Sequence, residues 1–222
     1  MNKMAHIKYG NQIGARGKPL KIVYWNQGSS HLLRKMPYVK LLVDQHKPHM
    51  LALAEANILQ NHDLTELKIQ DYTLHLASSV SDPTLAVARV AVYTHKTITV
   101  KRRPDLEDAG LQLIVLEAGL PRQKKSLYLI SYRQWQLPNQ QDTTSGTVAA
   151  QAERWDRLLG RWEAALLEGK EVITVMDANL DAMTWRNEIQ ALPCHSTSFT
   201  HSALIDRLFE RIIPQGVETL TP

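Results

Sequence analysis

The sequence has little cysteine: Cys194 is the single one among 222 residues. One cysteine cannot build a disulfide framework and has no second cysteine for a zinc site, so a reducing compartment is expected. The chain also lacks any apolar run close to the roughly 20 residues that a membrane-spanning helix needs. Its first 19 residues are polar and basic and contain no apolar core of a secretion signal. We therefore expect an intracellular protein without a membrane partner.

Neither sign of charge dominates, because the formal net charge is only +4. The basic residues nevertheless cluster in segments 95–103 and 121–125, on either side of an apolar run at 111–119. If these segments are neighbouring strands and their turns, their Lys and Arg residues gather at one edge, where they could contact phosphates without regard to sequence. An equal alternative is a set of solvated charges that protects the sheet edge. The five candidates are Lys101, Arg102, Arg103, Lys124 and Lys125.

Apolar, β-branched runs predict strands, and two amphipathic segments predict helices. One helix is expected within 31–49, with Pro37 early in it, and another runs from Val148 to Leu166 and ends at Gly169, with Trp155 and Trp162 as core anchors. A shorter helix is expected over 202–213. The order is strand, helix, strand, then a meander, then helix and strand, which predicts one α+β domain with mixed sheets and outer helices. The predicted strands are 20–25, 50–55, 86–94, 97–100, 111–119, 126–132 and 171–176.

Polar side chains follow four of the predicted strands at the point where each strand ends. Turn chemistry alone does not explain them, because Glu and Tyr are poor turn residues. Phosphodiester cleavage calls for a cation, for neutral donors such as Asn and Tyr, and for a carboxylate that takes a proton from water. The set has this composition: Asn26, Glu55, Tyr132 with Arg133, and Asp177 with Asn179.

Four segments in this order, KIVYWNQGS, LALAEAN, LISYRQW and VMDANLD, resemble the endonuclease/exonuclease/phosphatase superfamily. The endonuclease domains of LINE-type (non-LTR) retrotransposon proteins are especially similar, because they share the YR-x-W segment and a following A-x-x-ERW helix. The resemblance implies a four-layer α/β sandwich, with two mixed sheets face to face and helices on both outer faces. It covers residues 20–222 and leaves 1–19 as a basic extension.

The resemblance also implies a role for each residue at the strand ends. Glu55 is similar to the carboxylate that binds Mg²⁺ or Mn²⁺, and Asn26 to the residue that orients this carboxylate or shares the metal. Asp177 is similar to the residue that deprotonates the attacking water, and Asn179 to a donor that holds a phosphate oxygen. Tyr132 resembles the hydroxyl beside the scissile phosphate. For Arg133, a phosphate contact and a salt bridge at the strand end are equally good interpretations.

The sequence departs from the family pattern after Asn179. The family's terminal Ser-Asp-His has no match, since His195 and His201 lie in a turn-rich segment without such a partner and are interpreted as loop histidines. Met176 stands where the family usually has glycine. The expectation at this point is a C-terminally truncated domain that lacks its last strands and has little or no nuclease activity.

The resemblance implies a metal-dependent DNA endonuclease that nicks one strand for target-primed reverse transcription. Its partners would be DNA and, in a longer parent protein, a reverse transcriptase domain and the element RNA, in the nucleus of a eukaryotic host. Two alternatives stay open. One is a phosphatase or phosphodiesterase of the same fold that acts on a small phosphate ester, and the other is a catalytically dead remnant that only binds nucleic acid.

Overall fold

The computed structural model describes residues 4–9, 20–28, 30–59, 61–77, 87–108, 110–119, 126–133 and 148–177. The chain divides into two compact units. The first comprises Met1–Arg133 with Ala165–Asp177, and the second comprises Gln134–Ala164 with Ala178–Pro222. Both sheets and the first helix belong to the first unit.

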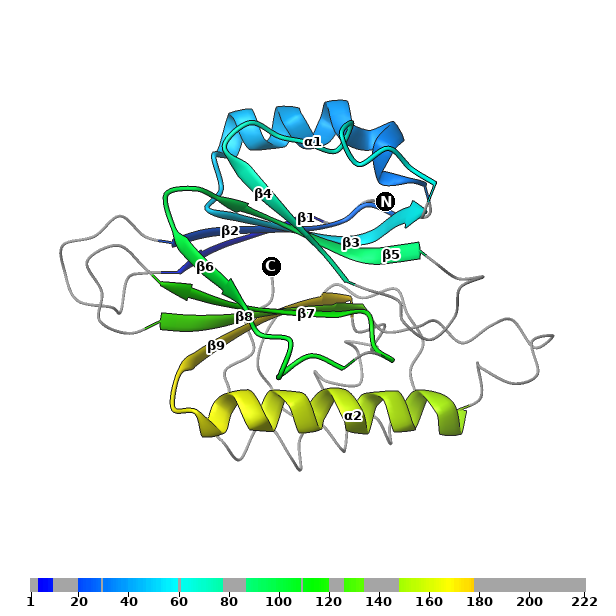
Figure 1. Cartoon of the computed structure of the whole chain (residues 1–222), viewed down its shortest axis with the longest axis vertical. Coiled ribbons are helices and arrows are strands. Elements are labelled where there is room, and N and C mark those ends of the chain that lie inside the picture. The colour runs from blue at the N-terminus through cyan, green and yellow to red at the C-terminus, as the bar shows by residue number, and fades with distance from the viewer. Residues whose placement is uncertain are drawn as a thin grey trace, which may run out of the picture. The chain divides into compact units, whose positions relative to one another are not determined.

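The first unit contains two mixed β-sheets (Figure 1). In the first sheet, β2 and β3 are parallel and the other pairs are antiparallel, in the order β1 (Met4–Tyr9), β2 (Leu20–Asn26), β3 (Met50–Leu59), β5 (Val87–His95), β4 (Tyr72–Leu76). In the second, β8 and β9 are the parallel pair, in the order β6 (Thr99–Arg102), β7 (Leu113–Gly119), β8 (Ser126–Arg133), β9 (Glu171–Asp177). The predicted α+β class with mixed sheets is confirmed.

The two sheets pack face to face through a shared apolar core. Alternate residues of the strands of both sheets form one buried cluster, for example Ile22 and Val92 from the first sheet and Leu129 and Ile173 from the second. Successive side chains of a strand point to opposite faces, so the residues between these belong to the outer faces. This alternation fixes which strand-end residues can reach the space between the sheets.

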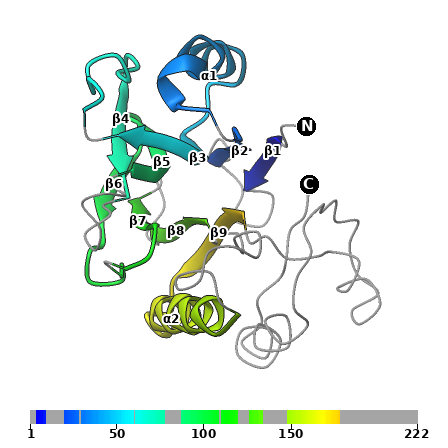
Figure 2. The same cartoon turned by 90° about the vertical axis from the view of Figure 1, so that its right-hand side faces the viewer.

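Helix α1 (Leu32–His46) covers the outer face of the first sheet (Figure 2). Leu32, Met36 and Val39 recur at helical spacing and pack into a second core cluster with Leu51 and Leu53 of β3. Pro37 lies in the first half of the helix, as the sequence predicted. The helix ends at Lys47, whose backbone is left-handed and whose amide donates to the carbonyl of Val43.

Helix α2 (Val148–Leu167) has the register that the sequence predicted. Trp155 and Trp162 are buried, which confirms them as core residues. Gly169 follows with a φ of +69°, the left-handed conformation that favours glycine beyond a helix end. Neither of the two helices in the described part of the chain is long and apolar enough to cross a membrane.

Three expectations differ from the structure or lie outside it. Strands β1 and β4 were not predicted, and β1 lies within the basic segment 1–19 and pairs with β2. The strand expected at 97–100 lies at Thr99–Arg102, because the preceding residues form a turn in which the Ile98 amide donates to the carbonyl of His95. The helix expected over 202–213 falls outside the described residues.

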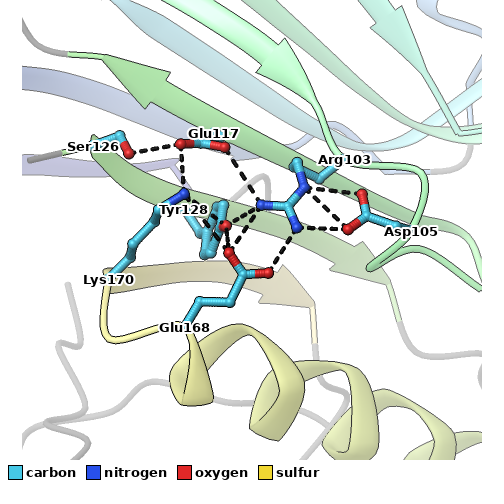
Figure 3. Close-up of polar contacts among 7 residues, drawn as sticks. All are labelled: Arg103, Asp105, Glu117, Ser126, Tyr128, Glu168 and Lys170. Carbon is cyan, nitrogen blue, oxygen red and sulfur yellow. Dashed lines mark hydrogen bonds and ion pairs between the residues drawn. The ribbon is translucent and has the colours of Figure 1, made fainter.

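A network of charged residues joins the turn after α2 to the second sheet, and we call it the Arg103 network (Figure 3). The Arg103 guanidinium lies 2.7 Å from Glu168 Oε1 and 2.5 Å from Asp105 Oδ2. Lys170 Nζ lies 2.5 Å from Glu117 Oε1, and the buried Tyr128 hydroxyl donates to Glu168. Hydrogen bonds from Arg103 and then from Tyr128 lower the pKa of Glu168 from 4.5 to about 2.

Glu168→Gln should therefore lower the free energy of unfolding near neutral pH and reduce the change of this free energy with pH in the acid range. Because the pKa of Glu168 is lower in the folded chain, its stabilising contribution is full above about pH 4.5 and is lost as the pH falls toward 2. The expected loss near pH 7 is about 1 kcal/mol, since the pair is partly solvated. Urea denaturation from pH 7 to pH 2 measures it, with the exposed Glu66→Gln as the matched control. An unchanged slope of unfolding free energy between pH 4.5 and 2 would contradict the assignment.

Candidate functional site

Three strands end in polar residues, whereas the end of β3 predicted at Glu55 is wrong, because that strand continues past a bulge to Leu59. Asn26 ends β2, in register with Ala54 of the parallel strand β3. Arg133 ends β8, in register with Asp177 at the end of the parallel strand β9. An ion pair between Arg133 Nη2 and Glu55 Oε1, at 3.4 Å, connects the two sheets at this point. The structure thus brings Asn26, Glu55 and Arg133 together, with the backbone of Asp177 beside Arg133.

The Glu55 carboxylate is mostly buried but weakly held. Its side chain is 13% exposed, and Oε1 lies 3.4 Å from both Asn26 Nδ2 and Arg133 Nη2. Both distances exceed the 2.7–3.2 Å that is usual for N–H···O bonds. A buried carboxylate is costly unless it is paired and well hydrogen-bonded. Among the described residues, the contacts of this carboxylate to side chains are therefore long, which suits a group that also binds a ligand.

Glu55 owes its direction to a β-bulge in β3. The register with β5 shifts between Ala54 and Ile58, and within the bulge Glu55 and Asn57 have φ values of +57° and +47°. Regular alternation would place Glu55 on the α1 side with Leu53, but Ala56 takes that core position instead. The bulge turns Glu55 toward the second sheet. Left-handed residues other than glycine cost about 1–2 kcal/mol each, and such strain clusters at functional sites.

Asn26 is placed to orient Glu55. Its Oδ1 accepts a hydrogen bond from the Gly28 amide at 2.9 Å, which leaves Nδ2 facing the carboxylate. Asn26 therefore faces Glu55 as a donor, which is the contact that an orienting role needs. Its binding of a metal stays a prediction.

Two guanidinium groups lie near the Glu55 carboxylate. Arg133 is 5% exposed, and its Nε has no hydrogen-bond partner among the described residues. Arg89 of β5 interacts electrostatically with both Arg133 and Glu55. Its pKa is lowered, mainly by burial and then by the positive charge of Arg133, whereas the negative charge of Glu55 raises it. Two cations beside one carboxylate suit an anionic ligand such as a phosphate. Sequence reasoning missed Arg89, although an arginine inside an apolar strand was a usable signal.

The structure does not place the side chains of the other predicted strand-end residues, Tyr132, Asp177 and Asn179, beside Glu55. Tyr132 is fully buried, and by alternation it lies on the face of β8 opposite Leu129 and Arg133, so it does not share their side of the sheet. Its role beside the phosphate stays a prediction. Asp177 is described at its backbone, which ends β9. Asn179 lies outside the described residues, as do the loop histidines His195 and His201.

The predicted phosphate-binding cations differ in their contacts. Arg102 Nη2 lies 2.9 Å from Glu107, and Arg103 is the centre of the Arg103 network, so both guanidiniums are held by carboxylates of the same chain. Lys101 is exposed on β6. Lys124 and Lys125 lie outside the described residues. DNA contact by this set stays a prediction, and Lys101 is its most accessible described member.

The residues around Glu55 fit a divalent cation such as Mg²⁺ that keeps several waters. Mg²⁺ is commonly bound through one or two carboxylates and requires oxygen ligands. Within the described ranges, no three His, Cys, Asp or Glu side chains gather closely enough to hold a metal ion by themselves. Glu55 supplies a buried carboxylate with loose contacts, and the backbone of Asp177 ends the strand next to Arg133. These residues suit a cation that is bound by few protein ligands and keeps most of its water molecules.

Comparison with known proteins finds similarity in structure alone: no protein-family model and no curated protein matches the sequence. The endonuclease domain of TRAS1, a telomere-specific non-LTR retrotransposon, superposes with a TM-score of 0.57 at 14% identity, over 90% of this chain and 73% of that one. The catalytic domain of Xenopus laevis APE2 gives 0.56 at 15% identity, over 85% and 67%. TDP2 from C. elegans gives 0.52 at 17% identity, over 78% and 50%.

These proteins all have the endonuclease/exonuclease/phosphatase fold, and this chain shares it. The expected sandwich is thereby confirmed. The chain spans about three quarters of the TRAS1 domain and half of the TDP2 chain.

Proposed function

We propose that this chain is a metal-dependent DNA endonuclease whose site is formed by the bulge of β3 and the ends of β2, β8 and β9. One observation carries the proposal: a strained bulge turns the Glu55 carboxylate away from the α1 core and toward Arg133 of the second sheet. A protein that needed only a stable core would gain nothing from a buried, loosely paired carboxylate at this position. A phosphodiesterase needs one to hold its cation.

The residues divide the work of phosphodiester hydrolysis. When bound, Mg²⁺ supplies charge neutralisation and Lewis acidity at the phosphate. Glu55 would hold the cation, and Asn26 keeps Glu55 in its orientation through Nδ2. Arg133 and Arg89 would offset the negative charge that develops on the phosphate oxygens.

In the hydrolysis step, one proton leaves the attacking water and one proton is added to the leaving oxygen. Asp177 takes a proton from the attacking water, whose oxygen forms the new bond to phosphorus. The bond between phosphorus and the 3′ oxygen breaks, and this oxygen takes up a proton. The products are a 3′ hydroxyl and a 5′ phosphate. Asn179 would hold a phosphate oxygen during this step.

DNA is the proposed substrate. The support is the structural likeness to the endonuclease domain of a non-LTR retrotransposon, together with the exposed Lys101 and the mild excess of positive charge. By the same likeness, we propose that the 3′ hydroxyl primes reverse transcription, with a reverse transcriptase domain and element RNA as partners in the nucleus. A small phosphate ester as substrate, or DNA binding without cleavage, would be the alternative outcome of the test.

Nicking of supercoiled plasmid in Mg²⁺, with EDTA as the comparison, tests the proposal. Nicking in Mg²⁺ is expected, because Glu55 would hold the cation that the reaction needs. EDTA should abolish it. Cleavage that persists in EDTA would contradict metal dependence. Salt-sensitive DNA binding without any cleavage would identify a binding protein instead, and turnover of p-nitrophenyl phosphate alone would identify a phosphatase.

A further inference from the structure

Gln27 lies directly behind the bulge that aims Glu55. It is fully buried, and its side-chain Nε2 donates a hydrogen bond of 2.7 Å to the backbone carbonyl of Glu55. Its backbone amide donates to the carbonyl of Ala54 at 3.2 Å, which extends the ladder between β2 and β3 by one step. Its own carbonyl accepts a hydrogen bond from Lys35 Nζ of α1.

The bond from Gln27 replaces one that the regular ladder cannot make. The parallel pairing of β2 with β3 stops at Asn26 and Ala54, and the next residue of β3 is the left-handed Glu55. A buried backbone carbonyl needs a donor. A side chain that reaches across from β2 supplies it, and only the amide nitrogen can do so, because the partner is an acceptor.

Among the described residues, the side-chain amide of Gln27 makes one hydrogen bond, the one to the Glu55 carbonyl. Its Oε1 is buried without a hydrogen-bond partner among the described residues. A methionine would fill the same space without leaving a buried polar atom unpaired. The polar side chain is therefore explained by the bond that its nitrogen makes to Glu55.

The far end of the bulge is held in the same way from the start of α1. His31 Nδ1 lies 2.8 Å from the carbonyl of Asn57, the second left-handed residue. Since the carbonyl is an acceptor, the ring nitrogen is the donor. Both strained residues of the bulge thus have their carbonyls bound by side chains from the segment that follows β2.

We propose that Gln27 is a positioning residue, which holds Glu55 in its left-handed conformation and so keeps the carboxylate directed at the second sheet. Its consequence for metal binding rests on the function proposed above, but its effect on the Glu55 backbone does not. Outer partners that fix a metal-binding side chain typically change metal affinity by 10- to 100-fold when they are removed. A loss of at least about tenfold is expected here.

The test uses Gln27→Met, which keeps the length of the side chain and removes the donor. The matched control is Val23→Ala, a buried residue of β2, the strand that Gln27 directly follows, and it packs in the α1 core. Two quantities are measured on the full chain: the NMR coupling between the amide and α protons of Glu55, which reports its φ angle, and the affinity for Mn²⁺ by electron paramagnetic resonance. Gln27→Met should change the coupling and weaken Mn²⁺ binding, and Val23→Ala should change neither.

The outcomes separate this inference from the function on which part of it rests. An unchanged coupling and an unchanged Mn²⁺ affinity in Gln27→Met would overturn it, as would equal losses in Val23→Ala, which would indicate general destabilisation. If the wild type binds no Mn²⁺, the proposed function fails while the coupling still decides the role of Gln27. Should Gln27→Met not fold, Gln27→Leu, which also has no hydrogen-bond donor, is judged by the same criteria.

Discussion

Glu55→Gln is expected to reduce Mg²⁺-dependent nicking by about 10²–10³-fold, the scale on which loss of one transition-state stabilising group acts. Glutamine keeps the shape of the side chain, and its Oε1 can still accept from Asn26 and Arg133. What disappears is the negative charge that would hold the cation. Activity should therefore fall while the backbone of the bulge stays in place.

Two controls make the Glu55 experiment specific. Glu66→Gln removes an exposed carboxylate on a turn of the same unit and should leave nicking unchanged. Circular dichroism should show that Glu55→Gln is folded, with a stability loss of about 1–3 kcal/mol from leaving the Arg133 charge without its partner. Nicking at the wild-type rate by folded Glu55→Gln would remove Glu55 from the site.

Asp177→Asn is expected to lower the rate about 10²–10⁴-fold, which is the usual contribution of a general base. The reason differs from that for Glu55. Asp177 would take the proton of the attacking water, and asparagine cannot accept it. Binding of Mn²⁺ should stay within about threefold of the wild type, because Glu55 carries the principal ligand charge. The two variants should thus separate loss of chemistry from loss of the cation.

Glu171→Gln, at the other end of β9, is the control for Asp177→Asn. It changes a carboxylate on the same strand but outside the strand ends that form the site, so nicking and Mn²⁺ affinity should both stay at the wild-type level. If Asp177→Asn instead lost Mn²⁺ affinity as fully as Glu55→Gln, Asp177 would be a metal ligand. Full activity in Asp177→Asn would exclude it from both roles.

The sequence predicted the parts of the fold in which burial follows a simple period. The stripe of α2 with Trp155 and Trp162 is one such case, and the apolar runs of β3 and β8 are others. Strand β4 was missed because its sequence, YTLHL, is short and only partly buried, so it carries little apolar signal. Strand β1 was missed because its basic surroundings suggested an extension.

The sequence proposed residues for the site but did not predict how their side chains are directed. The structure brings Asn26 and Glu55 together with Arg133, three residues that the sequence proposed for one site. Alternation alone, however, would direct Glu55 into the α1 core, and no local signal in LALAEAN predicts a left-handed glutamate. The direction of Glu55 depends on hydrogen bonds between segments that are distant in sequence, among them the one from Gln27.

A titration of the wild-type chain and of Glu55→Gln with Mn²⁺, followed by electron paramagnetic resonance at neutral pH, tests the central claim most directly. It asks whether the carboxylate that the bulge turns toward Arg133 binds a divalent cation, whatever the rate of cleavage. We predict one site in the wild type and an affinity at least about tenfold weaker in Glu55→Gln. Equal binding by the two chains, or no binding by the wild type, would contradict the account.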